Sequence, residues 1–117
     1  MNTVTLSIES RDDITRRALA AFDGQAQEAR ISFPSLETLW SVMTKKRWEI
    51  LQAMTGRGEL TYRAVAGLVG RDVKAVHDNL TALLDAGLVE KSENGRLVFP
   101  YDEIHVDFRL RAPTVAA

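Results

Sequence analysis

The sequence predicts an α+β fold, because two different hydrophobic periods follow one another along its 117 residues. Strict alternation of apolar and polar residues near both ends of the chain indicates two amphipathic strands. Apolar residues at helical spacing fill most of the stretch between them. Residues 60–99 are predicted to form, in order, a short helix, a glycine turn, a second helix and a two-stranded ribbon, with very short connections between them. That order predicts a winged helix-turn-helix.

Residues 1–30 are predicted to form a strand and a helix that serve as an N-terminal dimerisation extension. Residues 3–8 alternate without error and indicate a half-buried strand. Ser10 and Asp13 have the spacing of a capping box, which starts the helix. The apolar stripe of this helix consists of Ile14, Ala18, Leu19 and Phe22. Residues 23–28 are polar and indicate a linker or a frayed helix end.

Two further helices are predicted at the start of the DNA-binding domain, which we assign to residues 31–100. Ser35 caps the first, whose apolar residues at helical spacing are Leu36, Leu39, Trp40 and Met43. Thr44 opens the second, which contains Trp48, Leu51 and Met54. We expect both tryptophans to pack in the core.

The helix-turn-helix and its wing follow from local signals. Thr61 is the N-cap of a helix with Val65, Leu68 and Val69 on its buried side, and Gly70 ends it in a left-handed conformation. Asp72 is the N-cap candidate of the second helix, whose inward residues are Val73, Val76, Leu80, Leu83 and Leu84. Gly87 ends that helix. Asn94-Gly95 between two short apolar runs predicts a hairpin.

Residues 101–112 are predicted to form a C-terminal strand, and residues 113–117 a disordered tail. The two terminal strands can pair within one subunit or across two. We expect a sheet shared between two subunits, because a two-fold protein can meet a pseudo-palindromic operator. The residues expected at this dimer interface are Val4, Leu6, Ile8, Ile14, Phe22, Ile104, Val106, Phe108 and Leu110.

The segment from Val76 through Leu83 to Val89 resembles the recognition helix and wing entry of bacterial winged-helix transcriptional regulators of the MarR and ArsR type. A longer resemblance, over roughly residues 31–110, is to small prokaryotic predicted regulators. It rests on Phe33-Pro34-Ser35, residues 43–51, residues 70–77 and residues 100–104. Genes for such regulators often lie beside toxin genes, where the regulator acts as antitoxin. The resemblance implies a homodimeric repressor that binds double-stranded DNA, with a toxin protein as a second partner. The alternative is an interaction module that neutralises a toxin with weak or no DNA binding.

The exposed start of the second helix of the motif is expected to enter the major groove, where base edges are accessible. Its candidate contacts are Arg71, Lys74, Ala75, His77 and Asp78. Arginine and lysine suit guanine, which presents two acceptors side by side. Asn79 can bind adenine or be partly buried, and Asp78 can accept from cytosine or orient a neighbouring cation. For His77 and Lys74, the alternative is a solvated helix face.

Three further groups of residues are candidates for the sugar–phosphate backbone. Thr61, Tyr62 and Arg63 open a helix whose N-terminal amides favour a phosphate. The first turn of another helix contains Lys45, Lys46 and Arg47, whose charges oppose the helix dipole and would be stabilised by a facing polyanion. For these three residues too, the alternative is a solvated helix face. The ribbon contributes Lys91, Asn94 and Arg96, although Glu93 opposes such a contact.

Composition excludes several classes of protein. The net charge is −1, yet residues 41–100 carry nine basic and seven acidic groups. The basic excess therefore falls on the region that is predicted to bind DNA. The absence of cysteine excludes a disulfide framework and fits a reducing cytoplasm. No apolar run is long enough to span a membrane. We expect no enzyme, metal or cofactor, because nothing places the two histidines, His77 and His105, beside a nucleophile and the carboxylates lack metal-ligand spacing.

Overall fold

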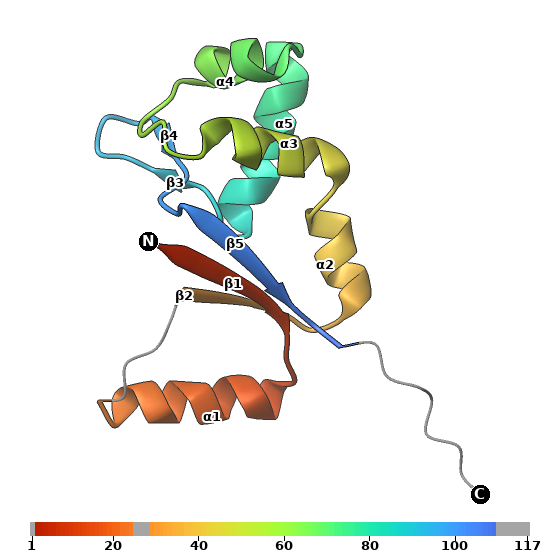
Figure 1. Cartoon of the computed structure of the whole chain (residues 1–117), viewed down its shortest axis with the longest axis vertical. Helices are drawn as coiled ribbons and strands as arrows, with labels where there is room; N and C mark the ends of the chain where they lie inside the picture. The colour runs from red at the N-terminus through yellow and green to blue at the C-terminus, as the bar shows by residue number, and fades with distance from the viewer. Residues whose placement is uncertain (1, 25–28, 110–117) are drawn as a thin grey trace, which may run out of the picture.

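The computed structural model describes residues 2–24 and 29–109 of the chain. This part forms a mixed α+β fold with five helices and two small sheets, which confirms the α+β class of the prediction (Figure 1). In chain order the elements are β1 (Thr3–Ile8), α1 (Arg11–Phe22), β2 (Ala29–Phe33), α2 (Leu36–Val42), α3 (Lys45–Met54), α4 (Tyr62–Val69), α5 (Val73–Asp85), β3 (Glu90–Lys91), β4 (Leu97–Val98) and β5 (Glu103–Asp107). None of the helices in these ranges combines the length and apolarity that a membrane span requires.

The larger sheet is entirely parallel and has β1 at its centre, between β2 and β5. Val4 lies opposite Ala29 on one side and Ile104 on the other, and Thr5 lies opposite Arg30 and His105. Because side chains alternate along each strand, the sheet has one apolar face and one polar face. Helices α2 to α5 lie on one side of the sheet and α1 on the other (Figure 1).

The terminal strands pair with each other inside one chain, which corrects the expectation of a sheet shared between subunits. Val4 and Leu6 are fully buried without a second copy, since the helical layer of the same chain covers them. Ile104 and Val106 are half-buried against the same core. Leu110, the linker at 25–28 and the tail at 113–117 lie outside the described residues.

The third strand, β2, was not predicted. Its signal is present but short, because Ala29, Ile31 and Phe33 alternate with Arg30 and Ser32 over only five residues. The predicted linker covers residues 23–28, and no strand or helix was predicted for residues 29–33. The strand extends the sheet and pairs with β1 from Val4 to Ile8.

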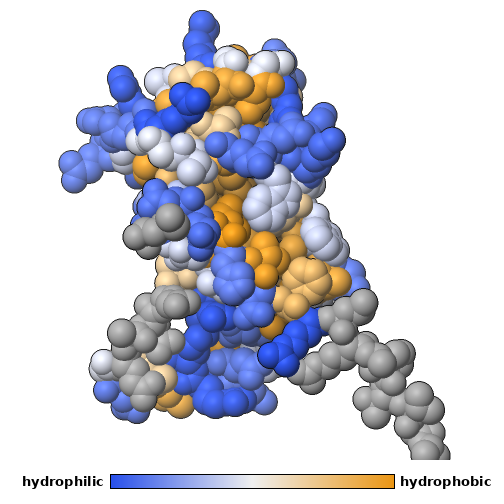
Figure 2. Space-filling view, in the orientation of Figure 1, coloured by the Kyte–Doolittle hydropathy of each residue, from blue (hydrophilic) through white to orange (hydrophobic). Residues whose placement is uncertain are grey.

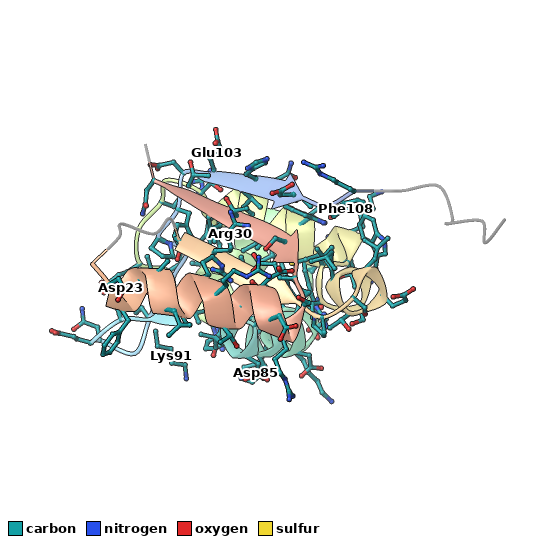
Figure 3. All side chains as sticks on the ribbon, turned by 90° about the horizontal axis from the view of Figure 1, so that it is seen from below. Asp23, Arg30, Asp85, Lys91, Glu103 and Phe108 are labelled. Atoms are coloured by element: carbon teal, nitrogen blue, oxygen red, sulfur yellow. The ribbon has the colours of Figure 1, made fainter. Side chains whose placement is uncertain are left out.

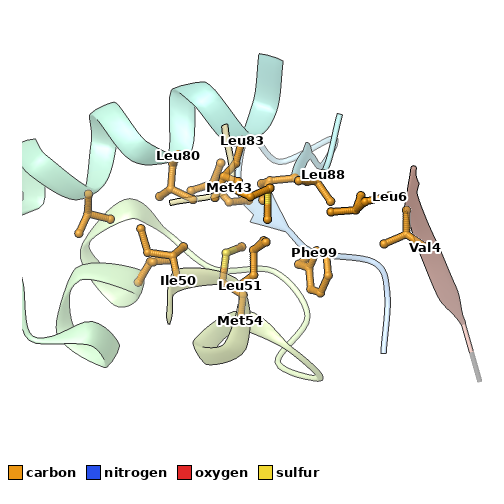
Figure 4. Close-up of a cluster of buried hydrophobic side chains, with 14 of the residues drawn as sticks. Val4, Leu6, Met43, Ile50, Leu51, Met54, Leu80, Leu83, Leu88 and Phe99 are labelled. Carbon is orange, nitrogen blue, oxygen red and sulfur yellow. The ribbon is translucent and has the colours of Figure 1, made fainter. Parts of the chain in front are cut away.

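A single hydrophobic core joins the sheet to the helical layer. Figure 4 shows Val4 and Leu6 from β1 beside Leu88 and Phe99, which follow α5 and β4. Further in, Ile50, Leu51 and Met54 of α3 face Leu80 and Leu83 of α5. The predicted N-terminal extension and DNA-binding domain therefore share one core.

The predicted helix caps are confirmed for the helices that begin after Ser10, Ser35, Thr44 and Thr61, whose side-chain oxygens accept from backbone N–H groups three residues on. At the end of α5, Gly87 has a φ of 83°. Its N–H donates to the Leu84 carbonyl (3.1 Å), and the Leu88 N–H donates to the Leu83 carbonyl (3.0 Å). This pair of bonds is the Schellman motif, and it turns buried Leu88 back towards the core.

Three apolar residues that were expected in the core are substantially exposed. Trp40 is 52% exposed, because the short α2 buries only Leu39. Leu68 and Val73 are each 41% exposed. The buried side of α4 is centred on Val65 and Ala66 instead, and Val73 lies in the first turn of α5 at the edge of its buried stripe. Trp48 is half-buried and packs against the core as expected.

Helix α1 meets the polar face of the sheet through an ionic network and buries no residue. Glu9, just after β1, pairs with Arg17 of α1 (2.9 Å) and with Arg30 of β2 (3.1 Å). Arg17 also donates to the Ser32 hydroxyl at 2.8 Å. Seen from below, Arg30 lies between α1 and β1 (Figure 3). Burial alone would raise the pKa of the Glu9 carboxyl, but hydrogen bonds from Ser7 and Arg17 and the arginine charges together lower it.

Candidate nucleic-acid interface

The site that the sequence predicts is centred on α4, the turn after it and α5. Thr61 Oγ1 accepts from the Ala64 N–H at 3.1 Å and begins α4. Gly70 has a φ of 65°, a left-handed conformation that costs glycine little, and it ends α4 as predicted. The Arg71 N–H then donates to the Ala66 carbonyl at 3.1 Å, and α5 begins two residues later. Asp72 occupies the N-cap position of α5, but its side chain makes no capping hydrogen bond.

The first two turns of α5 have one buried and one exposed side. Val76 and Leu80 are fully buried. Four of the five predicted base-contacting residues are exposed on the same stretch of helix, namely Lys74, Ala75, His77 and Asp78. The structure therefore brings these four together on a surface that a ligand can reach.

His77 stacks on Tyr62, a contact that the sequence did not predict. Their ring centroids lie 4.7 Å apart with an angle of 28° between the ring planes. Tyr62 is half-buried at the start of α4, whereas His77 is exposed on α5. The stack orients the His77 imidazole and ties the start of α4 to the exposed side of α5. No local signal reveals it, since the two residues meet only because the helices cross.

Two of the four arginines predicted to contact DNA, Arg71 and Arg47, are held by other parts of the same chain. Arg71 forms an ion pair with Glu49 of α3 and donates to the Lys46 carbonyl at 3.1 Å, with only 19% of its side chain exposed. Arg47 donates to the Asn79 side-chain oxygen at 3.2 Å and to the carbonyls of Ser41 and Val42. Both guanidinium groups are therefore in contacts that hold α3 to its neighbours.

The sequence left open whether Asn79 contacts adenine or is partly buried, and the structure shows partial burial. The Asn79 side-chain oxygen accepts from Arg47. The partial burial next to fully buried Leu80 reflects its place at the border of the packed side of α5.

Exposed cations remain on the elements next to α5. Lys45 and Lys46 lie exposed in the first turn of α3, and Arg63 lies exposed in the first turn of α4. None of these three, nor Lys74, takes part in an ion pair within residues 2–24 and 29–109. In Figure 2, hydrophilic side chains project from the upper end of the molecule, where α4 and the β3–β4 hairpin lie.

The predicted ribbon is present as the antiparallel pair β3 and β4, with Lys91 opposite Leu97. The turn between them includes Gly95 at a φ of 74°, as the Asn94-Gly95 signal predicted. Leu60 adds a third chain segment to this ribbon, because its backbone exchanges two 2.8 Å hydrogen bonds with Leu97. No local pattern of residues predicts this bridge, because Leu60 and Leu97 are far apart in the chain.

The tip of the ribbon exposes Lys91, Asn94 and Arg96, the three predicted backbone contacts. Asn94 donates to Glu59 at 3.3 Å, so the tip is tied to the loop before α4. Hydrogen bonds from Ser92 and Asn94, more than the charge of Arg96, lower the pKa of the Glu59 carboxyl. Glu59 and exposed Glu93 leave the ribbon less cationic than the α3–α5 surface.

A comparison with protein families shows where this chain belongs. The family model described as HVO_A0114 matches residues 42–106, which span α3 to β5 and contain every predicted DNA contact of this chain. No curated protein matches the chain. Because the matched region exceeds half of the 117 residues, the chain belongs to the HVO_A0114 family.

Proposed function

We propose that this protein is a sequence-specific DNA-binding transcriptional regulator that acts as a homodimeric repressor. In this proposal, α4 and α5 are the two helices of a winged helix-turn-helix, and the β3–β4 hairpin is its wing. The observation that carries the proposal is the exposed side of α5, where Lys74, Ala75, His77 and Asp78 are open to solvent beside the cations of α3 and α4. A helix presented in this way fits the width of the major groove.

The roles of individual residues follow from their surroundings. Lys74 is the best candidate for a guanine, since it is exposed in the first turn of α5. Lys45, Lys46 and Arg63 are suited to phosphates, because they lie at helix N-termini whose dipoles a phosphate would complement. Arg71 and Arg47 hold the helices of this surface together, because their side chains already donate hydrogen bonds to residues of α2, α3 and α5.

The test begins with selection of binding sites from random duplex DNA, followed by fluorescence anisotropy at several salt concentrations. Lys74→Ala should weaken the selected site by about 1–3 kcal/mol and relax discrimination at one base position. The control is Arg109→Ala, which removes an exposed arginine just after β5, at the end of the sheet away from α4 (Figure 1). Equal binding by both variants and the wild type would refute the assigned interface.

An exposed aromatic pair favours a second function, binding of a partner protein. Trp40 and Phe108 are 52% and 39% exposed, and their rings meet edge to face with centroids 6.1 Å apart. Exposed aromatic residues are enriched at protein interfaces. A toxin encoded by a neighbouring gene is the partner that the resemblance suggests, and an antitoxin can also repress its own operon. An apolar complex would hardly respond to salt, whereas DNA binding weakens steeply as salt rises.

A further inference from the structure

Helix α1 has its apolar residues on the side that is turned away from the sheet. Phe22 is 90% exposed and Ile14 is 42% exposed, and no residue of the helix is buried. The side that meets the sheet is polar and is held by the Arg17–Glu9 ion pair. In Figure 2, the lower edge of the molecule, where α1 lies, is mostly hydrophilic in this view and has a small hydrophobic area at its left. The described part of the chain leaves this apolar side uncovered.

The exposed side of α1 has the two surface features that helix packing requires. Ile14, Ala18 and Phe22 are spaced four residues apart and form a ridge with a small residue at its middle. Beside the ridge is a hollow of about 230 Å³, lined by Ile14, Arg17, Ala18 and Ala21. Helices pack by fitting the ridge of one into the groove of the other, most often with ridges of this spacing. Ridge and groove lie next to each other on this one helix, so α1 is complementary to itself.

The charges at the two ends of α1 favour a copy that runs in the opposite direction. At the beginning of the helix, Arg11 and Asp12 are exposed and offset each other, and Asp13 is paired with Arg16 at 3.1 Å. The C-cap carries the exposed Asp23, which no ion pair in the described residues compensates (Figure 3 labels Asp23 at this end), and a parallel copy would place the two Asp23 side chains together. An antiparallel copy brings Arg11 of each helix towards Asp23 of the other, and it also sets the helix dipoles in opposite directions.

From these observations we infer that α1 is the interface of a homodimer, in which two antiparallel copies of α1 cross at Ala18 about a two-fold axis. The small side chain of Ala18 lets the helix backbones approach, and Ile14 and Phe22 of each copy pack on either side of that crossing. This interface replaces the expected sheet of terminal strands. The inference rests on the proposed function in one respect, because a dimer would give the regulator two DNA-binding surfaces.

The test is the mass of the full-length chain in solution without DNA, measured by sedimentation over a range of micromolar concentrations. Wild type should be a dimer, and Ala18→Glu should raise the dissociation constant at least about 100-fold, because it buries two charges at the crossing. The matched control is Ala64→Glu, the same substitution at an exposed alanine of α4, which should leave the mass unchanged. Circular dichroism establishes that each variant keeps its helices.

A charge exchange tests the direction of the two helices. Arg11→Asp and Asp23→Arg should each weaken the dimer, and the double variant should restore it. Ala18→Glu should also bind a single half-site like the wild type but lose affinity for a full palindrome, which separates failure of the interface from failure of DNA binding. A wild type that remains monomeric throughout, or a dimer that Ala18→Glu leaves intact, would overturn the inference. A monomer would assign the apolar side of α1 to a different protein.

Discussion

Replacing Arg71 by alanine should lower the free energy of unfolding by about 1.5 kcal/mol, and its effect on DNA binding should follow from that loss. The Arg71 guanidinium donates to the Lys46 carbonyl at 3.1 Å in a mostly buried position, a bond worth about 1 kcal/mol. Its ion pair with Glu49 adds only about 0.5 kcal/mol, since 41% of the Glu49 side chain is open to solvent.

The assay pairs two measurements on two variants. Urea denaturation should show the loss of about 1.5 kcal/mol for Arg71→Ala, which corresponds to about 5 °C in melting temperature for a chain of this size. Lys74→Ala should stay within about 0.5 kcal/mol of the wild type, because Lys74 is exposed. Binding to the selected DNA should show the reverse order, with the larger change of base preference in Lys74→Ala.

A double-mutant cycle with Glu49→Gln isolates the ion pair. The coupling energy between Arg71 and Glu49 should be about 0.5 kcal/mol, and it should shrink as salt rises. The reasoning fails if Arg71→Ala unfolds like the wild type while it changes which base the protein prefers. In that case Arg71 would leave Glu49 and enter the groove on binding DNA.

Three further predictions concern the phosphate contacts, the core and acid stability. Lys46→Ala should weaken binding to all DNA sequences alike and reduce the slope of log affinity against log salt by about one, and an unchanged slope would exclude the contact. Leu6→Ala should cost about 3 kcal/mol of unfolding free energy in urea, because Leu6 is fully buried where the sheet meets the helical layer. The lowered pKa of Glu9 predicts that its contribution to stability is complete above the ordinary value of 4.5 and is lost as the pH falls through the lower folded value. Glu9→Gln should therefore make the unfolding free energy less dependent on pH in acid, and an identical pH profile would contradict this role.

The elements that could be predicted from the sequence are those set by neighbouring residues. Thr61 begins α4, Gly70 ends it, and Asn94-Gly95 forms the turn of the hairpin. These signals are local, because capping and turn formation involve residues only a few positions apart. The exposed positions of Lys74 and His77 also followed, since helical periodicity placed Val76 and Leu80 on the opposite side.

What could not be predicted depends on segments that are distant in sequence. The bonds that hold Arg71 to Glu49 and Arg47 to Asn79 exist because α3, α4 and α5 cross at particular angles. The same holds for the stack of Tyr62 and His77. A basic residue near a predicted recognition helix looks the same in the sequence whether it faces solvent or a carboxylate on another helix.

The alternation in the terminal strands predicted an apolar face for each strand without identifying its partner. Val4 and Ile104 would be buried equally well in a sheet within one chain or in a sheet shared between two. The same holds for α1, where the stripe of Ile14 and Phe22 predicted an apolar side without identifying what covers it, and the structure turns that side away from the sheet. Periodicity shows that a side is apolar, and only tertiary structure shows what covers it.

The pairing of β1 with β5 has a consequence for how the protein is made. Thr3 and Glu103 are partners in this sheet although they stand at opposite ends of the described chain. During synthesis, β1 leaves the ribosome long before its partner β5 has been made. The elements from α3 to β4 are close together in sequence and pack on one another. We therefore expect the helical layer to form first on the growing chain, with one edge of β1 unpaired until β5 has left the ribosome. Over that interval, the exposed edge is the part of the nascent protein most open to pairing with another chain.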